Sequence, residues 1–127
     1  MTFAMKKDLT VGYDEALAKV PEALKSEGFG VLTEIDVAKT LKAKIDVDFR
    51  RYKILGACNP PLAHEALSTM LEVGLMLPCN VVVYENDDGK ATVLAIDPVQ
   101  TVAAAQPALA KMATAVRDKL SRVLEKL

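Results

Sequence analysis

The fold is decided by two segments, Ile54-Leu55-Gly56-Ala57-Cys58-Asn59-Pro60-Pro61 and Leu77-Pro78-Cys79-Asn80-Val81-Val82-Val83-Tyr84. In the first, an apolar strand pattern runs into a helix start, because asparagine is a good helix cap and proline a good first helical residue. In the second, a loop runs into a valine-rich strand. Both cysteines lie at these boundaries, and the single histidine, His64, follows one helical turn after the first. The two boundaries therefore predict one site at the end of a sheet.

Hydrophobic spacing predicts the elements around these boundaries. Apolar strand patterns cover residues 2–9, 29–35, 52–57, 81–85 and 91–96. Apolar residues spaced by three or four positions predict helices over residues 13–28, 37–44, 60–71 and 107–127. Within the second strand, one face is expected to carry Phe29, Val31, Thr33 and Ile35. The segment Glu72–Pro78 is expected to be a loop.

This order of elements predicts an α+β fold. We expect a two-layer sandwich with a mixed β-sheet and helices packed mainly on one face, because helices separate most strands and the last two strands form a hairpin. With 127 residues, 51% of them apolar, the chain is expected to form one domain over residues 1–127. Leu120 and Val123 lie on the apolar stripe of the last helix, which either covers the sheet or meets a partner copy.

Composition and charge exclude several functions. Sixteen Lys and Arg nearly cancel seventeen Asp and Glu, leaving a net charge of -1 and no concentrated basic face for nucleic acid. No window approaches the ~18 consecutive apolar residues of a membrane helix, and the N-terminus lacks the order of a signal peptide, so we expect a cytoplasmic protein with reduced cysteines. No phosphate-binding loop or Gly-x-Ser-x-Gly motif occurs, and we assign no cofactor.

Cys58, Cys79 and His64 are the candidates for catalysis. Cys58 precedes a predicted helix N-terminus, where the helix dipole favours a thiolate, and His64 is the only imidazole that could assist it. A soft-metal site using both thiols is an alternative, although no Cys-x-x-Cys or His-x-x-x-His spacing occurs, and we assign no metal. Small cysteines are also common core residues, so the sequence leaves the catalytic role open.

Charged residues near the boundaries allow two further interpretations. The helix start after Asn59 could bind an anion through its backbone amides, with Arg50 and Arg51 supplying counter-charge, but a solvated basic face explains the same arginines. Glu34 and Asp36 stand two positions apart at a strand end and could form an acid pair. Alternatively, Asp36 caps the next helix and Glu34 is a surface carboxylate.

Three motifs resemble the domain of unknown function 302 family. They are Gly28-Phe29-Gly30-Val31-Leu32-Thr33-Glu34-Ile35-Asp36, the segment Tyr52–Pro61 with its Gly-x-x-Asn-Pro, and Leu77-Pro78-Cys79-Asn80-Val81-Val82-Val83-Tyr84-Glu85. The resemblance spans nearly the whole chain and implies a compact α+β domain that forms a homodimer, with no established activity. The positions that match the family's recurrent motifs are Glu34, Asp36, Asn59, Pro60, Pro78 and Cys79.

Our leading hypothesis is a small cytoplasmic binding or carrier protein with a thiol-lined pocket. As partners we expect a second copy in a homodimer and a small-molecule or thiol ligand, but neither nucleic acid nor a membrane. The expected ligand-binding residues are Glu34, Asp36, Cys58, Asn59, Pro60, Cys79 and Asn80. Two alternatives remain open: a cysteine-dependent enzyme or sulfur carrier, and a homodimeric interaction module with structural cysteines that works through the last helix.

Overall fold

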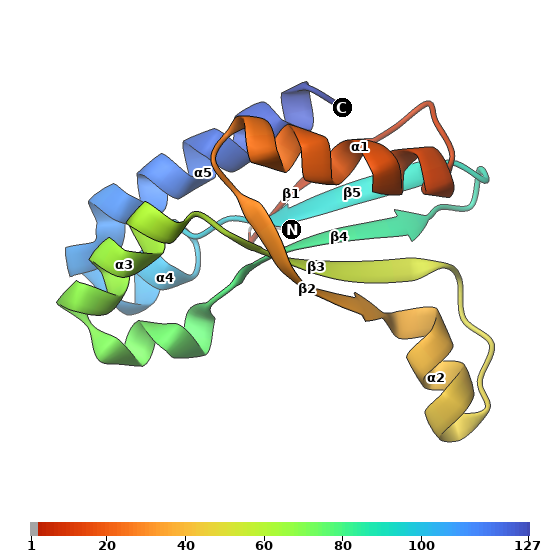
Figure 1. The fold of residues 1–127 in the computed structure, drawn as a ribbon, viewed down its shortest axis with the longest axis horizontal. Helices are drawn as coiled ribbons and strands as arrows, with labels where there is room; N and C mark the ends of the chain where they lie inside the picture. Colours follow the sequence, from red (N-terminus) through yellow and green to blue (C-terminus); the bar gives the residue numbers. More distant parts are fainter. Residues whose placement is uncertain (1–2) are drawn as a thin grey trace.

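The computed structural model describes residues 3–127 (Figure 1). The strands are β1 (Ala4–Asp8), β2 (Gly30–Asp36), β3 (Tyr52–Cys58), β4 (Cys79–Glu85) and β5 (Ala91–Ile96). The α-helices are α1 (Tyr13–Ser26), α2 (Val37–Ile45), α3 (Pro60–Thr69), α4 (Val102–Ala105) and α5 (Ala110–Glu125), and the 3₁₀ helices are η1 (Leu71–Met76) and η2 (Pro107–Leu109). The strand expected over residues 2–9 corresponds to β1, and its first residue, Thr2, lies outside the described residues. None of the helices in the described part of the chain has the length and apolar character needed to cross a membrane.

The strands form an antiparallel sheet in the order β1-β5-β4-β3-β2. The α+β fold class is confirmed, but the expected mixed sheet is wrong, because all four neighbouring pairs in this sheet of the described residues are antiparallel. The helix α1 does join two strands that run in the same direction, β1 and β2. These strands lie at opposite edges of the sheet with three strands between them, so they never pair. The helix α3 joins antiparallel neighbours, β3 and β4.

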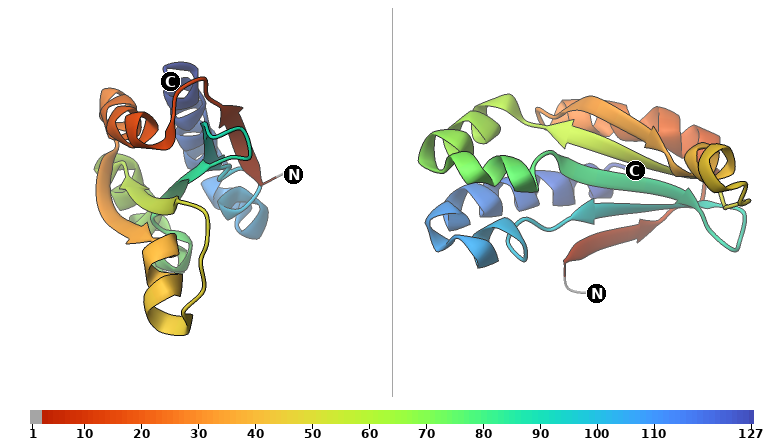
Figure 2. Two further views of the ribbon diagram at one scale, coloured as in Figure 1. Left: turned by 90° about the vertical axis from the view of Figure 1, so that its right-hand side faces the viewer. Right: turned by 90° about the horizontal axis from the view of Figure 1, so that it is seen from below.

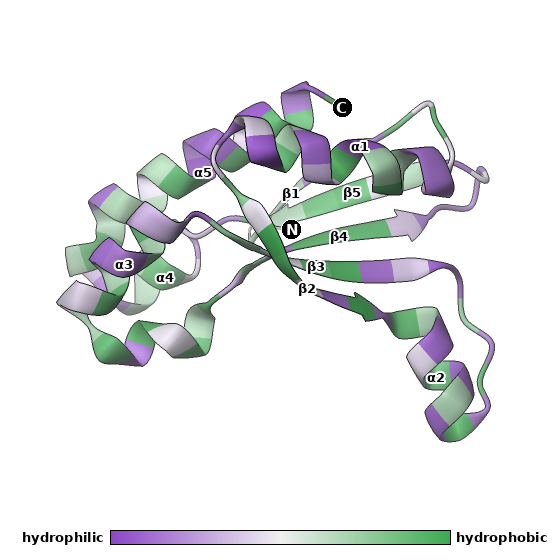
Figure 3. Ribbon diagram, in the orientation of Figure 1, coloured by the Kyte–Doolittle hydropathy of each residue, from purple (hydrophilic) through white to green (hydrophobic). Residues whose placement is uncertain are grey.

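The helices α1 and α5 cover one face of the sheet, as expected (Figure 2). Figure 3 shows that both helices alternate between polar and apolar residues, whereas apolar residues dominate β4 and β5. The buried positions on the covered face include Leu55, Val81, Val83, Val93 and Ala95. Leu120 and Val123 of α5 are 0% and 1% exposed. These two residues of the last helix therefore pack in the core, and the alternative that they meet a partner copy is wrong for them.

The opposite face of the sheet is not covered by α1 or α5 (Figure 2, right). On this face Ile35, Ile54, Val82 and Leu94 are register partners across β2, β3, β4 and β5. All four are at least partly exposed, and Ile35 is 49% exposed. The helix α2 projects away from the rest of the molecule, and none of its residues is buried (Figure 1). We call the uncovered sheet surface that carries Ile35, Ile54, Val82 and Leu94 the open face.

Two helix starts form as predicted. The side chain of Asp36 accepts a hydrogen bond from the backbone N–H of Lys39 at 3.0 Å and so caps α2. The side chain of Asn59 accepts one from the backbone N–H of Leu62 at 3.3 Å and caps α3, whose first residue is Pro60. Each cap satisfies a backbone donor that the first helical turn leaves free.

Two segments differ from the prediction. The register of β2 shifts between Val31 and Thr33, so that Val31 pairs with Ala57 and Thr33 with Gly56. Val31 and Thr33 were expected to share a face of the sheet. They point to opposite faces instead, because the bulge inserts one extra residue between them and consecutive residues of β3, Gly56 and Ala57, face opposite ways. The expected loop before β4 is largely the 3₁₀ helix η1, in which the side chain of Val73 is buried in the core.

Candidate functional site

A cavity of about 300 Å³ lies at the end of the sheet where β3 ends at Cys58 and β4 begins at Cys79. We call this the cysteine end. Ala57 is the register partner of Cys79, so the two cysteines lie on neighbouring strands, and both line the cavity. In Figure 1 this end lies toward α3, α4 and the start of α5. The volume falls at the lower end of the ~300–1,000 Å³ typical of small-molecule sites.

The wall of this cavity is apolar. The helix α3 contributes Ala63, Ala66 and Leu67, and the helix α5 contributes Met112 and Val116. On the side of β2, the wall is formed by residues at and before the register shift, among them Phe29 and Leu32. Within residues 3–127, no aspartate, glutamate, lysine, arginine or histidine lines this cavity. Binding there must therefore depend on burial of apolar surface.

Gly56 allows two wall residues to approach the sheet closely. A Cβ atom built on Gly56 would overlap the hydroxyl of Thr33 and lie 2.8 Å from Cγ of Pro78. Both Thr33 and Pro78 line the cavity, and the Leu77–Pro78 peptide bond is cis. A side chain at position 56 would therefore force the side chains of Thr33 and Pro78, or β3 itself, to shift.

The side chain of Asn59 borders the cavity, and each of its polar atoms already makes one hydrogen bond. Its carbonyl oxygen accepts the capping hydrogen bond from Leu62, and its amide nitrogen donates to the backbone oxygen of Glu27 at 3.5 Å. These contacts join the start of α3 to the end of α1. Asn59 is therefore a structural part of the wall, and its backbone position supports the geometry of Cys58.

The two thiols are the distinctive chemical groups of the cavity. Both cysteines are free and partly buried. Burial raises the pKa of the Cys79 thiol from 9.0 to about 11, and the neighbouring Cys58 contributes to the increase. At neutral pH, Cys79 is thus a protonated, polarisable group and a poor nucleophile.

The arrangement does not assemble a catalytic dyad with His64. This histidine lies on α3, but it is exposed and does not line the cavity, whereas its neighbour Ala63 does. Among residues 3–127, no group of three or more His, Cys, Asp or Glu is positioned to hold a metal ion. The residues at the cysteine end therefore provide two thiols without a visible general base.

A second cavity, of about 280 Å³, adjoins the first. The two share one wall, which includes Leu77, Pro78, Cys79 and Pro98. Asn80 lines only this second cavity, and Pro60 lines neither. The structure therefore brings Cys58, Asn59 and Cys79 of the predicted binding residues to the main cavity.

Glu34 and Asp36 lie away from the cavity and do not act as an acid pair there. Glu34 forms an ion pair of 2.6 Å with Lys53 on the neighbouring strand, and this hydrogen bond raises the pKa of Lys53. Asp36 caps α2 and lines a separate small cavity that also includes Arg51 and Lys53. The observed contacts match the second sequence interpretation, in which Asp36 caps a helix and Glu34 is a surface carboxylate, and not the acid pair.

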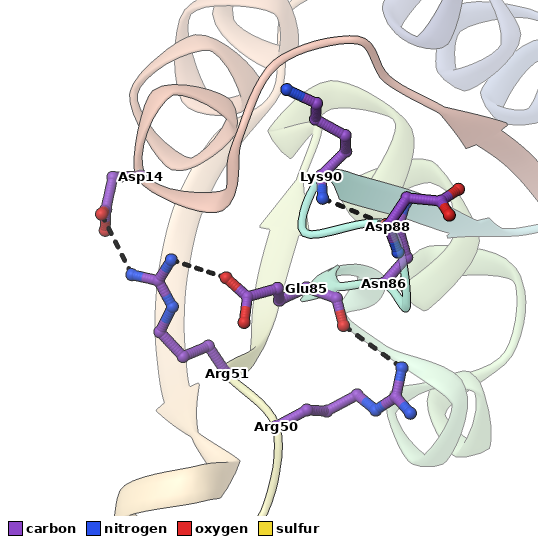
Figure 4. Close-up of polar contacts among 7 residues, drawn as sticks. All are labelled: Asp14, Arg50, Arg51, Glu85, Asn86, Asp88 and Lys90. Atoms are coloured by element: carbon purple, nitrogen blue, oxygen red, sulfur yellow. Dashed lines mark hydrogen bonds and ion pairs between the residues drawn. The ribbon is translucent and has the colours of Figure 1, made fainter.

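Arg50 and Arg51 lie at the other end of the sheet, where β3 begins and β4 ends. We call this the charged end (Figure 4). Arg51 bridges Asp14 at 3.0 Å and Glu85 at 2.8 Å, and these hydrogen bonds raise its pKa. Arg50 donates to the backbone oxygen of Glu85 and pairs with Asp87 at 3.1 Å. These arginines are engaged far along β3 from Asn59 and do not supply counter-charge to the start of α3.

Sequence reasoning missed the walls that come from distant segments. Met112 and Val116 belong to the apolar stripe of the last helix, which was expected to cover the sheet or to meet a partner copy, because an apolar stripe has the same spacing whether it packs or lines a cavity. Pro98 and Val102 follow β5 and carried no signal of a site. The contribution of Leu32 depends on the register of β2, which the sequence pattern misjudged.

Comparisons with known proteins agree with the fold. The model of the family "Domain of unknown function DUF302" matches residues 5–127. A solved structure of an uncharacterized conserved DUF302 protein from Bacillus stearothermophilus is 34% identical, with a TM-score of 0.91 over 99% of this chain and 98% of that one. No match was found among curated proteins.

Proposed function

Because the chain belongs to the DUF302 family, whose name assigns no activity, we propose a function from its cavity: the protein binds or carries a small molecule at the cysteine end. The observation that supports this is an apolar cavity of about 300 Å³ with both cysteines in its wall. Concave apolar surfaces with a few polar groups are the usual form of small-molecule sites. We further infer that the protein works in the cytoplasm, where free cysteines such as these stay reduced.

In this proposal the thiol of Cys79 contacts the ligand as a neutral group. Because the pKa of Cys79 is raised to about 11, this thiol is protonated at neutral pH and suits contact with an apolar molecule. A cysteine-dependent enzyme or sulfur carrier ranks second. It would depend on Cys58, which directly precedes the cap of α3, and on a base other than the exposed His64.

A cavity-filling variant tests the proposal. The uncharged fluorescent probe N-phenyl-naphthylamine is titrated into the wild type, Ala63→Phe and His64→Phe. Ala63 lines the cavity and His64 is its exposed neighbour, so the two variants add a ring to the same helix inside and outside the site. We expect the wild type and His64→Phe to bind alike and Ala63→Phe to lose at least about tenfold in affinity, because the added ring occupies the cavity. Unchanged binding by a folded Ala63→Phe, or no binding by the wild type, would refute the proposal.

We also propose that the protein is a homodimer whose interface is the open face. The supporting observation is the row of apolar register partners, Ile35, Ile54, Val82 and Leu94, which α1 and α5 leave uncovered. Large contiguous apolar patches are uncommon on monomers, and a second copy offers the same apolar patch in a twofold arrangement.

Sedimentation velocity of the wild type, Val82→Lys and Leu71→Lys tests this interface. Both positions are accessible, but only Val82 belongs to the open face, and Leu71 is 80% exposed in η1. We expect a dimer for the wild type and Leu71→Lys and a folded monomer for Val82→Lys. A monomeric wild type would end the proposal, and a dimeric Val82→Lys would move the interface elsewhere.

A further inference from the structure

We infer that the ligand of the main cavity is an uncharged, predominantly apolar molecule with about the volume of two aromatic rings. This inference rests on the proposed binding function and concerns the chemical class of the ligand. Three properties of the wall carry it: its lack of charge, its small capacity for hydrogen bonding and its volume.

The first property is the absence of an available counter-charge. No ionisable residue other than the two cysteines lines the cavity within residues 3–127. The acidic residues adjoining wall segments in sequence are engaged elsewhere: Glu27 pairs with Arg122 at 2.8 Å and Lys126 at 2.7 Å. Asp97, next to Pro98, accepts a hydrogen bond from the backbone N–H of Val99 at 3.0 Å. An ionic ligand would lose its hydration without gaining a partner, which is costly.

The second property is the scarcity of free hydrogen-bonding groups. Each polar atom of the Asn59 side chain already makes one hydrogen bond, the oxygen with Leu62 and the nitrogen with Glu27, which leaves one N–H and one lone pair of Asn59 for a ligand. The hydroxyl of Thr33, an exposed residue of the wall, lies over Gly56 and makes no hydrogen bond with the rest of the described chain. One hydroxyl or carbonyl group of a ligand can be matched there. Further polar groups would be buried without partners at the remaining, apolar part of the wall.

The third property is volume. Apolar cavities of ~150 Å³ bind benzene, so a cavity of about 300 Å³ has room for roughly two such rings. The wall mixes aliphatic side chains with the ring of Phe29, the thioether of Met112 and the two thiols. Sulfur atoms and aromatic edges interact favourably with aromatic rings, which suits a fused-ring ligand.

A set of three probes with the same ring system and different charge tests the class. Calorimetric titration at pH 7 compares naphthyl methanol, naphthoate and naphthylmethylammonium, which are neutral, anionic and cationic. We expect the neutral alcohol to bind at least about tenfold more tightly than either ion, because only the ions pay an uncompensated desolvation cost. Equal or tighter binding of either ion would overturn the inference while leaving a binding function in place. Failure of all three probes would overturn both.

A charge placed at the mouth provides the second measurement. Leu32 is 68% exposed and lines the cavity, so Leu32→Lys should fold and hold its ammonium group at the opening. Leu71→Lys adds the same charge on η1, outside the wall. We expect Leu32→Lys to raise the affinity for naphthoate several-fold relative to Leu71→Lys and to lower that for naphthylmethylammonium. Identical affinities in the two variants would show that the probes bind elsewhere and would overturn the inference.

Discussion

At the charged end of the sheet, Arg51 lies between Asp14 and Glu85 and its guanidinium group sits 4.7 Å from the ring centre of Tyr13, whereas the cavity at the cysteine end has no such group within residues 3–127. The rings of Tyr52 and Tyr84 stack at 5.7 Å on the neighbouring strands of the charged end. The two ends belong to the same strands, β3 and β4. At one end the arginines are paired with carboxylates, and at the other an apolar cavity has no charged side chain in its wall within the described residues.

The difference shows where a ligand can gain free energy. Polar groups at the charged end already have protein partners, so a ligand would have to break these contacts in order to bind. At the cysteine end the wall has almost no partners to lose, and binding would bury apolar surface at little cost. Volume alone does not mark a site: the cavity beside Tyr13, of about 320 Å³, is slightly larger than the one at the cysteine end, but it is lined by Asp14, Arg51 and Lys53.

The largest expected effect concerns the reactivity of Cys79. In a Cys58→Ser variant, the folded protein should react with iodoacetamide at pH 8 more than about tenfold more slowly than the unfolded chain, because burial, the larger cause of the raised pKa of Cys79, remains after the contribution of Cys58 is lost. The rate should keep rising toward pH 11. A plateau near pH 9 would contradict a buried thiol at this end.

The same pKa shift predicts how stability depends on pH. The folded pKa of Cys79 lies above its ordinary value, so the contribution of the protonated thiol is present below pH 9 and is lost as the pH rises toward about 11. Cys79→Ala should lack this loss. Melting temperatures measured between pH 8 and pH 11 compare the two proteins, and parallel curves would argue against the shift.

The next effect concerns packing over Gly56. Gly56→Ala should lower the free energy of unfolding by about 2 kcal/mol, because the added methyl group meets Thr33 and Pro78. Gly30→Ala is the matched control on the neighbouring strand, since a Cβ there meets nothing within 4 Å. Urea denaturation measures both variants. Equal stabilities would mean that the cavity wall can move away from β3 freely.

A smaller change in stability is expected when either helix cap is removed, and the two caps should differ in their effect on binding. Asn59→Ala should cost about 1 kcal/mol and weaken probe binding, because α3 forms part of the cavity wall. Asp36→Ala removes the corresponding cap of α2, a helix with no buried residue, and should fray that helix with little change in global unfolding or binding. Hydrogen exchange of the two helices distinguishes these outcomes. Loss of binding in Asp36→Ala would contradict the separation of the ends.

The smallest effect is expected for Arg51→Met. The side chain is 48% exposed and both of its ion pairs lie at the surface, so the loss of stability should be close to the limit of detection, and smaller still at high salt. Probe binding should not change, because Arg51 lies at the charged end. Denaturation at low and high salt gives the measurement, and a loss as large as that of Gly56→Ala would mean that the charged end is not a solvated surface.

Local signals in the sequence predicted the elements well. Each correctly predicted feature depends on residues near one another in the sequence. These features are the caps at Asp36 and Asn59, the strands of the final hairpin and the apolar spacing in the last helix. The sheet was mispredicted because its order depends on where α1 carries the chain. The position of β2 at the edge opposite β1 depends on contacts between residues far apart in the sequence, and local sequence patterns do not report such contacts.

The candidate site was predictable only in its two central segments. Chain breakers and cysteines indicated the boundaries at Cys58 and Cys79, and both do line the cavity. The register shift in β2 decides which of its side chains reach this wall, and the shifted residues Val31, Leu32 and Thr33 themselves include no glycine or proline. Glu34 and Asp36 looked equally suitable by residue type, but strand direction carries them toward the charged end.

The strand order also determines when the site can exist during synthesis of the chain. The wall of the cavity takes residues from β2, α3, the segment before β4 and α5, so its parts are spread from Phe29 to Val116. Contacts between segments so far apart form late in folding, because long loops must close first. A nascent chain whose α5 has not yet left the ribosome would contain both thiols but would lack the part of the cavity wall that α5 contributes. The thiols would therefore pass through a stage of greater exposure to oxidants before the last helix packs.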